Sequence, residues 1–113
     1  MAAADHGPDR LAARHEIPAI DEAALHAARL ADKLLDAARQ IGNDRWAGFL
    51  APFPDRLRDE EPGALRKTAQ SARAAYGPRD SIRDALSDEL TLPFLAAIDR
   101  LLKVLARHRM RAD

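Results

Sequence analysis

The strongest helical signal in the chain is the stretch of residues 93–108, which reads PFLAAIDRLLKVLARH. Proline is favoured in the first turn of a helix, so Pro93 is predicted to open the last helix. Apolar side chains then recur at three- and four-residue spacing, which predicts one wide buried face. These apolar positions are Phe94, Leu95, Ile98, Leu101, Leu102 and Leu105.

A second long amphipathic segment covers residues 18–41. Pro18 precedes two acidic residues that suit the positive end of a helix dipole. The apolar positions of this first long helix are Ala27, Leu30, Ala31, Leu34, Ala38 and Ile41. Gly42 then predicts a left-handed helix stop, and Asn43 or Asp44 is expected to cap the helix that follows.

The middle of the chain holds most of the aromatic residues. Trp46, Phe49, Leu50, Phe53 and Leu57 would share one stripe if the helix were continuous. Two prolines, at positions 52 and 54, remove amide donors and clash with preceding carbonyls, which predicts a break near residue 51. Because these are the largest apolar side chains of the chain, we expect this segment to lie in the core, wedged between the first and last helices.

Two shorter helices are predicted between residues 59 and 86. An acidic turn at residues 59–63 leads into the first of them, with its inner face formed by Leu65, Ala69, Ala72 and Tyr76. Gly77 and Pro78 are expected to end that helix. Ser81 is in a position to cap the next one, which is short.

Length and composition predict one helical domain. The chain has 113 residues, which is in the usual range for a single domain, and its hydrophobic content of 47% includes only 4% aromatic residues. Abundant alanine, leucine, arginine and glutamate with few β-branched residues favour helix over strand. The fold class is therefore predicted to be all-α: a single-domain irregular bundle of four to five helices, with long first and last helices. Residues 1–17 are expected to form a mobile N-terminal arm and residues 18–113 the helical bundle domain.

Charge and cysteine content limit the classes of function. The 18 basic and 18 acidic side chains cancel, so no overall field draws the molecule to nucleic acid or to an anionic membrane. The chain has no cysteine, which excludes disulfides and thiolate chemistry and suits a cytoplasmic protein. The first residues are charged and lack the apolar stretch of a secretory signal, so we expect a cytoplasmic protein with no membrane partner.

A helix ending in glycine, a tryptophan-containing helix, a Pro-Gly turn and a Tyr-Gly loop follow one another from about residue 30 to the C-terminus. The residues concerned are Leu34, Leu35, Gly42, Trp46, Ala47, residues 62–65 and residues 76–84. In this order they resemble a family of small all-helical bacterial proteins of unknown function, whose loop reads about YGGMGS, an aromatic residue and Asn-Asp. Here Pro78, Arg79 and Asp80 replace the glycine-rich part of that loop, and Arg83 replaces its asparagine. Some proteins of this general type resemble immunity proteins of bacterial toxin systems, so the resemblance implies a partner that is a toxin.

No pattern of catalytic or metal-binding residues stands out. The four histidines, His6, His15, His26 and His108, do not form the helical pairs that a zinc site usually needs. The serines have no nucleophile-elbow setting, and no glycine-rich loop for phosphates follows a strand. We therefore expect no enzymatic activity, no metal and no cofactor.

Acidic residues form the first candidate binding surface. Asp80, Asp84 and Asp88 are spaced four apart, with Glu89 adjacent, and the acidic turn adds Asp59, Glu60 and Glu61. Carboxylates at this spacing share one edge of a helix and would suit a basic protein partner. The simpler interpretation, which we prefer, is that they stabilise a helix start and are partly neutralised by neighbouring arginines.

Basic residues of the last helix form the second candidate. Arg100, Lys103, Arg107 and Arg111 lie opposite its apolar face and are candidate anion-binding residues. Cations are also favourable near a helix C-terminus, and no helix-turn-helix pair is evident, so simple solvation is again the preferred interpretation.

Two functional hypotheses remain. The leading one is a small cytosolic protein-binding module, of the kind of an immunity-type inhibitor that covers a toxin's active site with its acidic edge. The alternative is a nucleic-acid-associated regulator that uses the basic face of the last helix. The two require surfaces of opposite charge, so substitutions can separate them.

Overall fold

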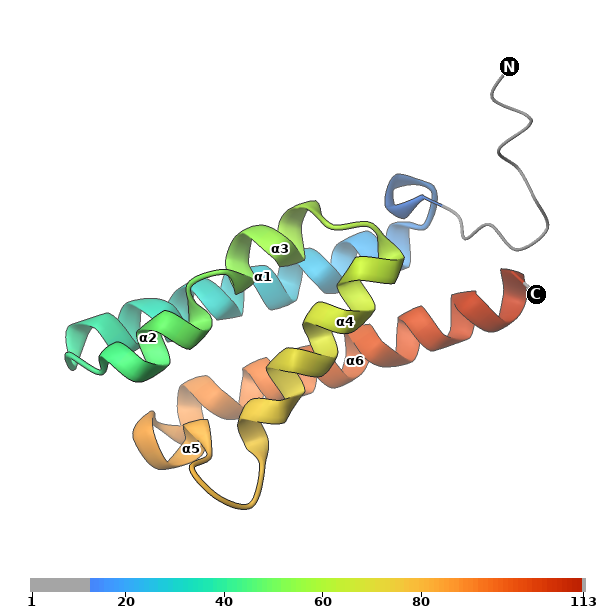
Figure 1. Cartoon of the computed structure of the whole chain (residues 1–113). Helices are drawn as coiled ribbons and strands as arrows, with labels where there is room; N and C mark the ends of the chain where they lie inside the picture. The colour runs from blue at the N-terminus through green and yellow to red at the C-terminus, as the bar shows by residue number, and fades with distance from the viewer. Residues whose placement is uncertain (1–12, 113) are drawn as a thin grey trace.

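The computed structural model describes the backbone of residues 13–112 and the side chains of residues 13–108. In this part of the chain all regular structure is helical (Figure 1). The α-helices are α1 (Pro18–Gln40), α2 (Asp44–Leu50), α3 (Phe53–Asp59), α4 (Pro62–Arg73), α5 (Ile82–Ala85) and α6 (Asp88–Ala112). Two short 3-10 helices, η2 (Arg14–Glu16) and η3 (Ala74–Tyr76), accompany them. α5 is a single turn, so five longer helices remain, and α1 and α6 are by far the longest of them. The prediction of an all-α bundle of four to five helices with long first and last members is therefore confirmed.

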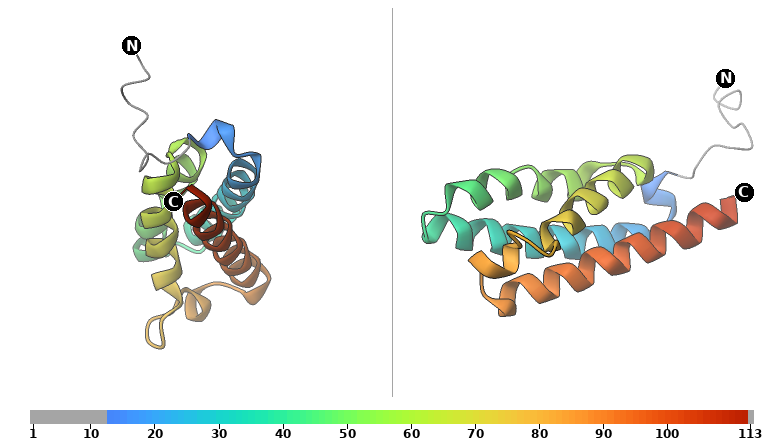
Figure 2. Two further views of the ribbon diagram at one scale, coloured as in Figure 1. Left: turned by 90° about the vertical axis from the view of Figure 1, so that its right-hand side faces the viewer. Right: turned by 60° about the horizontal axis from the view of Figure 1, so that its bottom comes forward.

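The helices are arranged around one core. α1 and α6 run antiparallel and pack directly against each other (Figures 1 and 2). α2 and α3 follow one another along α1, and α4 crosses from the end of α3 to α6. The prediction that the Trp46 segment is wedged between the first and last helices is therefore wrong, because those two helices contact each other and α2 packs on α1 instead.

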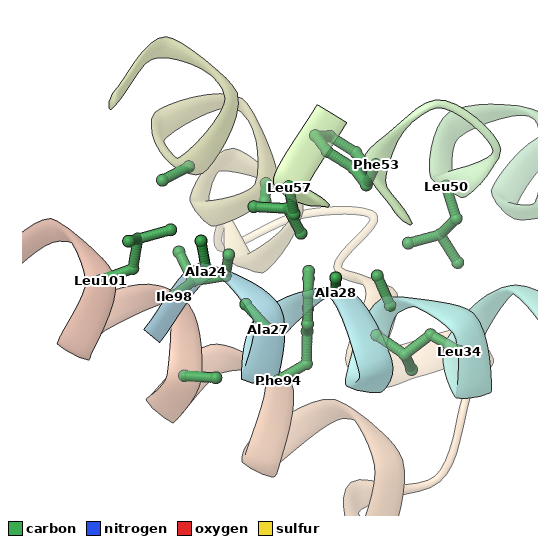
Figure 3. Close-up of a cluster of buried hydrophobic side chains, with 14 of the residues drawn as sticks. Ala24, Ala27, Ala28, Leu34, Leu50, Phe53, Leu57, Phe94, Ile98 and Leu101 are labelled. Carbon is green, nitrogen blue, oxygen red and sulfur yellow. The ribbon is translucent and has the colours of Figure 1, made fainter. Parts of the chain in front are cut away.

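Alanine makes the close packing of α1 possible. Six alanines of this helix are at most 1% exposed. Larger side chains of α3 and α6 pack against the helix at these alanines (Figure 3). Small side chains let neighbouring helices approach closely, while each buried leucine or phenylalanine contributes about 1.5–3 kcal/mol. The larger core residues shown with these alanines are Leu34, Leu50, Phe53, Leu57, Phe94, Ile98 and Leu101.

The first helix ends close to the predicted place. Gly42 has a φ of 70°, the left-handed conformation that suits glycine, and it directs the chain back along α1. Ile41 was predicted to belong to the buried stripe, but α1 stops at Gln40 and Ile41 is 59% exposed. The break predicted near residue 51 is confirmed, since α2 ends at Leu50 and α3 begins at Phe53.

The last helix begins earlier than Pro93. α6 starts at Asp88, and the carbonyl of Ser87 accepts hydrogen bonds from the amides of Leu90 (3.1 Å) and Thr91 (3.0 Å). The sequence Ser87-Asp88-Glu89 is a helix-start signal in its own right, with acidic residues at the positive end of the dipole. Pro93 thus lies inside the helix, which corrects the prediction that it opens it.

The N-terminal boundary of the packed structure also differs from the prediction. Residues 1–12 of the predicted arm lie outside the described part of the chain. Residues 13–17, which were assigned to the same arm, form η2 and pack at the start of α1, where Arg14 is only 4% exposed.

Within residues 13–112, no helix combines the length and the apolar character that crossing a bilayer requires.

Candidate functional site

One wall of the candidate site is built at the turn between α1 and α2. The side-chain oxygen of Asn43 accepts a hydrogen bond from the amide of Trp46 at 3.1 Å, which confirms that Asn43 caps α2. This cap fixes the first turn of α2, where Trp46 is buried and only 7% exposed.

Trp46 is held from two sides. Its ring meets Phe49 edge-on, with 5.3 Å between ring centroids and an interplanar angle of 84°, and Phe49 in turn lies 5.1 Å from Phe53. The guanidinium carbon of Arg45 lies 5.1 Å from the Trp46 ring centroid, within the range of a cation–π interaction. The indole is therefore a rigid aromatic wall with one cation already beside it.

The opposite wall is the loop that leads into α5. Asp80 has a φ of 51°, a left-handed conformation that is uncommon for a residue other than glycine but tolerated by aspartate. Next to it, the Ser81 hydroxyl oxygen accepts a hydrogen bond from the amide of Arg83 at 3.1 Å and caps α5. The unusual backbone at Asp80 and the cap at Ser81 together set the direction in which α5 presents Asp84.

These two walls enclose an open depression of about 230 Å³. It joins residues from two segments that are far apart in the sequence. The lining residues are Asn43, Arg45, Trp46, Asp80, Ser81, Asp84 and Ala85. Two carboxylates, one guanidinium and an aromatic ring thus surround a space large enough for one side chain and smaller than the usual small-molecule pocket.

The depression has the chemistry of a binding site. It brings two carboxylates, a guanidinium and an indole ring together, and the Ser81 oxygen accepts a backbone hydrogen bond. Among the described residues, no three histidine, aspartate or glutamate side chains gather closely enough to hold a metal ion. Carboxylates beside an aromatic wall are instead suited to a cationic group.

The predicted acidic residues are not one continuous surface. Asp80 and Asp84 lie at the depression, whereas Asp88 accepts two hydrogen bonds from Arg83, at 3.2 Å from Nε and 3.4 Å from Nη2. The hydrogen bond to Asp88 raises the pKa of the Arg83 guanidinium above its ordinary value. Glu89 is exposed on the first turn of α6.

The acidic turn at residues 59–61 is used within the fold. Glu60 accepts a hydrogen bond from the Thr68 hydroxyl, and the Glu61 carboxylate accepts one from the Arg14 amide at 2.8 Å. Asp59 is exposed. Two of the three carboxylates predicted to meet a partner here are therefore engaged in holding η2 and α4 in place.

Arg14 is buried beside this turn, and the sequence analysis did not predict this. Its Nε lies 2.7 Å from an Asp21 oxygen, and its Nη1 donates to the Glu60 carbonyl at 3.1 Å. A single 3-10 turn has no apolar periodicity, so no sequence pattern marked this arginine as buried.

The predicted basic residues of the last helix are exposed. Arg100, Lys103 and Arg107 lie on the outer face of α6, and none of them forms an ion pair with another described residue. The side chain of Arg111 lies outside the described part.

Comparison with known proteins gives no match to a family model, to a curated protein or to a solved structure.

Proposed function

We propose that the chain is a protein-binding module and that the depression between α2 and α5 receives a basic side chain of the partner. The observation that carries this proposal is the position of Asp80 and Asp84. Both carboxylates line the depression beside Trp46, and neither forms an ion pair with another described residue. Of the acidic set, they are the two carboxylates that line the depression.

Arginine is the side chain that fits this lining best. Its planar guanidinium forms two parallel hydrogen bonds with a carboxylate and also stacks on aromatic rings, whereas the ammonium of lysine acts as a point charge. Such anchors, surrounded by contacts that exclude water, dominate the energy of many interfaces. Arg45 already stands beside Trp46, so a partner's cation would approach from the side of Asp80 and Asp84.

An immunity-type role is the finer form of the proposal. Its support is the resemblance to the bacterial family. Trp46, Ser81 and Asp84 belong to the segments that carry that resemblance, and they also line the depression, whereas Asp80 departs from the family's loop pattern. An inhibitor that carries carboxylates at its contact surface would complement a toxin whose active site is lined by arginine or lysine. Such complementarity speeds encounter and fixes the register of binding.

Partner capture from a native lysate tests the proposal. The variant Asp80→Asn/Asp84→Asn removes both charges, and asparagine tolerates the left-handed backbone at position 80. Its matched control is Asp36→Asn/Asp55→Asn, which removes two exposed carboxylates elsewhere. We expect a protein that is retained by the parent and by the control to be lost with the first variant, since removing one partner of a desolvated charge pair costs about 2–5 kcal/mol.

The basic variant Arg100→Gln/Lys103→Gln/Arg107→Gln should retain the same protein. A captured partner that binds the Asp80/Asp84 variant as tightly as the parent would contradict the proposal.

A further inference from the structure

The depression between α2 and α5 has walls of opposite polarity. α2 and α5 lie at the same end of the molecule (Figure 1). The wall at α2 contains Arg45, and the wall at α5 contains Asp80 and Asp84. These three are the charged residues of the lining. A ligand in this space therefore meets a cation on one side and carboxylates on the other.

Arg45 does not close the space by pairing with the opposite wall. It lines the same depression as Asp80 and Asp84, yet the ion pairs among the described residues do not include it. Its guanidinium carbon lies 5.1 Å from the centroid of the Trp46 ring, which keeps the cation on the α2 wall. The opposite charges of the two walls are thus held apart, with the depression between them.

Asn43 adds a second donor to the α2 wall. Its side-chain oxygen accepts the hydrogen bond from the Trp46 amide that caps α2, and this contact distinguishes the oxygen from the NH2 group. The NH2 group can only donate, and the Asn43 side chain belongs to the lining. A guanidinium and an amide NH2 together suit a carboxylate. The α2 wall is therefore complementary to an anion, and the α5 wall is complementary to a cation.

The size of the depression limits how a ligand can carry both charges. Its volume of about 230 Å³ suits one arginine residue and lies below the usual range of small-molecule pockets, so two separate charged side chains would not fit. An arginine within a chain supplies a cation but no carboxylate. An arginine at a C-terminus supplies both, because its α-carboxylate and its guanidinium belong to one residue.

We propose that the depression receives the C-terminal arginine of a partner chain, with the guanidinium at Asp80 and Asp84 and the α-carboxylate at Arg45. This inference rests on the proposed function, because it specifies which basic side chain of the partner enters. Chain ends are exposed, so a terminal residue can enter an open depression without distorting the partner's fold. Arg45 then determines specificity for a chain end, since it repels an arginine that comes without a carboxylate.

Net charge alone predicts the opposite preference. The lining has two carboxylates and one guanidinium, so it favours a cationic ligand over a ligand that is neutral overall. N-acetyl-arginine amide is cationic, whereas in N-acetyl-arginine the carboxylate balances the guanidinium. Tighter binding of N-acetyl-arginine therefore requires a separate contact for its carboxylate.

NMR titration of the ¹⁵N-labelled full chain with these two probes measures the preference. We expect N-acetyl-arginine to bind about fivefold tighter than its amide, which is the upper end for an ion pair that stays exposed to solvent. The chemical shift of the Trp46 indole N–H reports both titrations, because Trp46 lines the depression. Asp80→Asn/Asp84→Asn should weaken the binding of both probes, since both use the guanidinium contact.

Two variants remove the carboxylate contact. Arg45→Gln removes the guanidinium, and Asn43→Asp keeps a capping oxygen for α2 while it replaces the NH2 donor by a carboxylate. In both variants the amide should bind at least as tightly as N-acetyl-arginine. The control Arg39→Gln removes an exposed arginine outside the depression and should keep the fivefold preference. Circular dichroism and thermal unfolding check that each variant folds.

The inference is overturned if N-acetyl-arginine binds no tighter than its amide, or if the preference persists in Arg45→Gln. In those cases the proposed function stands, provided that the amide shifts Trp46 in the parent and not in Asp80→Asn/Asp84→Asn. If neither probe shifts Trp46, the inference and the proposed function both fail. Free arginine that binds tighter than N-acetyl-arginine would also overturn the inference, because the depression would then select the amino acid and not a chain end.

Discussion

At the scale of single residues, two polar side chains connect elements that are distant in the sequence. Arg14 ties η2 to α1 and to the turn before α4 through its bonds to Asp21 and to the Glu60 carbonyl. The hydroxyl of Tyr76 donates to the carbonyl of Thr91 at 2.5 Å and so ties η3 to the first turns of α6. Because buried polar groups are costly unless they are hydrogen-bonded, each of these contacts specifies one arrangement of the helices.

The Tyr76 contact gives a prediction for stability. Replacing Tyr76 by phenylalanine removes the hydroxyl and its hydrogen bond while keeping the ring. We expect the free energy of unfolding to fall by about 1 kcal/mol, the usual net value of one such bond. Urea unfolding of the two proteins near neutral pH measures the difference.

The same residue should make stability depend on alkaline pH. Burial raises the pKa of the folded Tyr76 hydroxyl above its ordinary value of 10.0, so the folded protein keeps its proton at a pH where the unfolded chain loses it. The stabilising contribution is complete below a pH of about 10 and is lost as the pH rises further. The difference between parent and Tyr76→Phe should therefore shrink above that pH. A difference that stays constant would show that Tyr76 does not titrate differently on folding.

The sequence could not identify either contact. Tyr76 packs against the core as predicted, although it belongs to η3 and not to α4, which ends at Arg73. Its partner Thr91 is fifteen residues further along the chain and in another element. Arg14 has no periodic neighbours, and a charged side chain is normally expected at the surface. Its burial follows only from the way that η2 folds over the start of α1.

At the scale of the elements, local signals predicted most helix ends. The left-handed Gly42, the Asn43 cap and the proline-induced break near residue 51 are all properties of neighbouring residues, and all three are found. The start of α6 was misassigned because two local signals compete there. The acidic first turn after Ser87 outweighs the preference of Pro93 for the first turn, and helix packing against α1 and α4 makes the longer helix favourable.

Pro93 gives the prediction that belongs to this scale. Proline lacks the amide that would donate to the carbonyl of Glu89, and its ring crowds that carbonyl. Pro93 is exposed, so replacing it by alanine should restore the hydrogen bond without disturbing the core. We expect Pro93→Ala to raise the free energy of unfolding by about 1 kcal/mol, after allowing for the greater entropy of the unfolded alanine variant.

Urea unfolding measures this gain, with Ala96→Gly as the comparison. Ala96 is exposed on the same helix, and glycine there should cost about 1 kcal/mol. A Pro93→Ala variant that is less stable than the parent would contradict this prediction. It would mean that the missing hydrogen bond costs little and that the rigid backbone of Pro93 stabilises α6.

At the scale of the whole molecule, packing sorts charges that the sequence leaves mixed. The sequence singled out Trp46, Asp80 and Asp84 separately, and only the fold brings them to one depression. The same packing brings Glu60 to Thr68 and Glu61 to Arg14, so that these two carboxylates accept hydrogen bonds within the fold. Such groupings depend on contacts between distant segments, which helical periodicity does not encode.

The binding of a basic side chain at the depression can be measured directly by NMR. The probe is N-acetyl-arginine amide added to the ¹⁵N-labelled protein, with the neutral citrulline analogue as the control ligand. We predict weak binding, with a dissociation constant of about 1 mM, because a single side chain supplies only about 4 kcal/mol. The chemical shifts of the Trp46 indole N–H and of the Ser81, Asp84 and Ala85 amides should change with the arginine probe, and these changes should be absent in Asp80→Asn/Asp84→Asn. Equal changes with the citrulline analogue, or changes confined to other parts of the molecule, would contradict the assignment of the depression as the binding site.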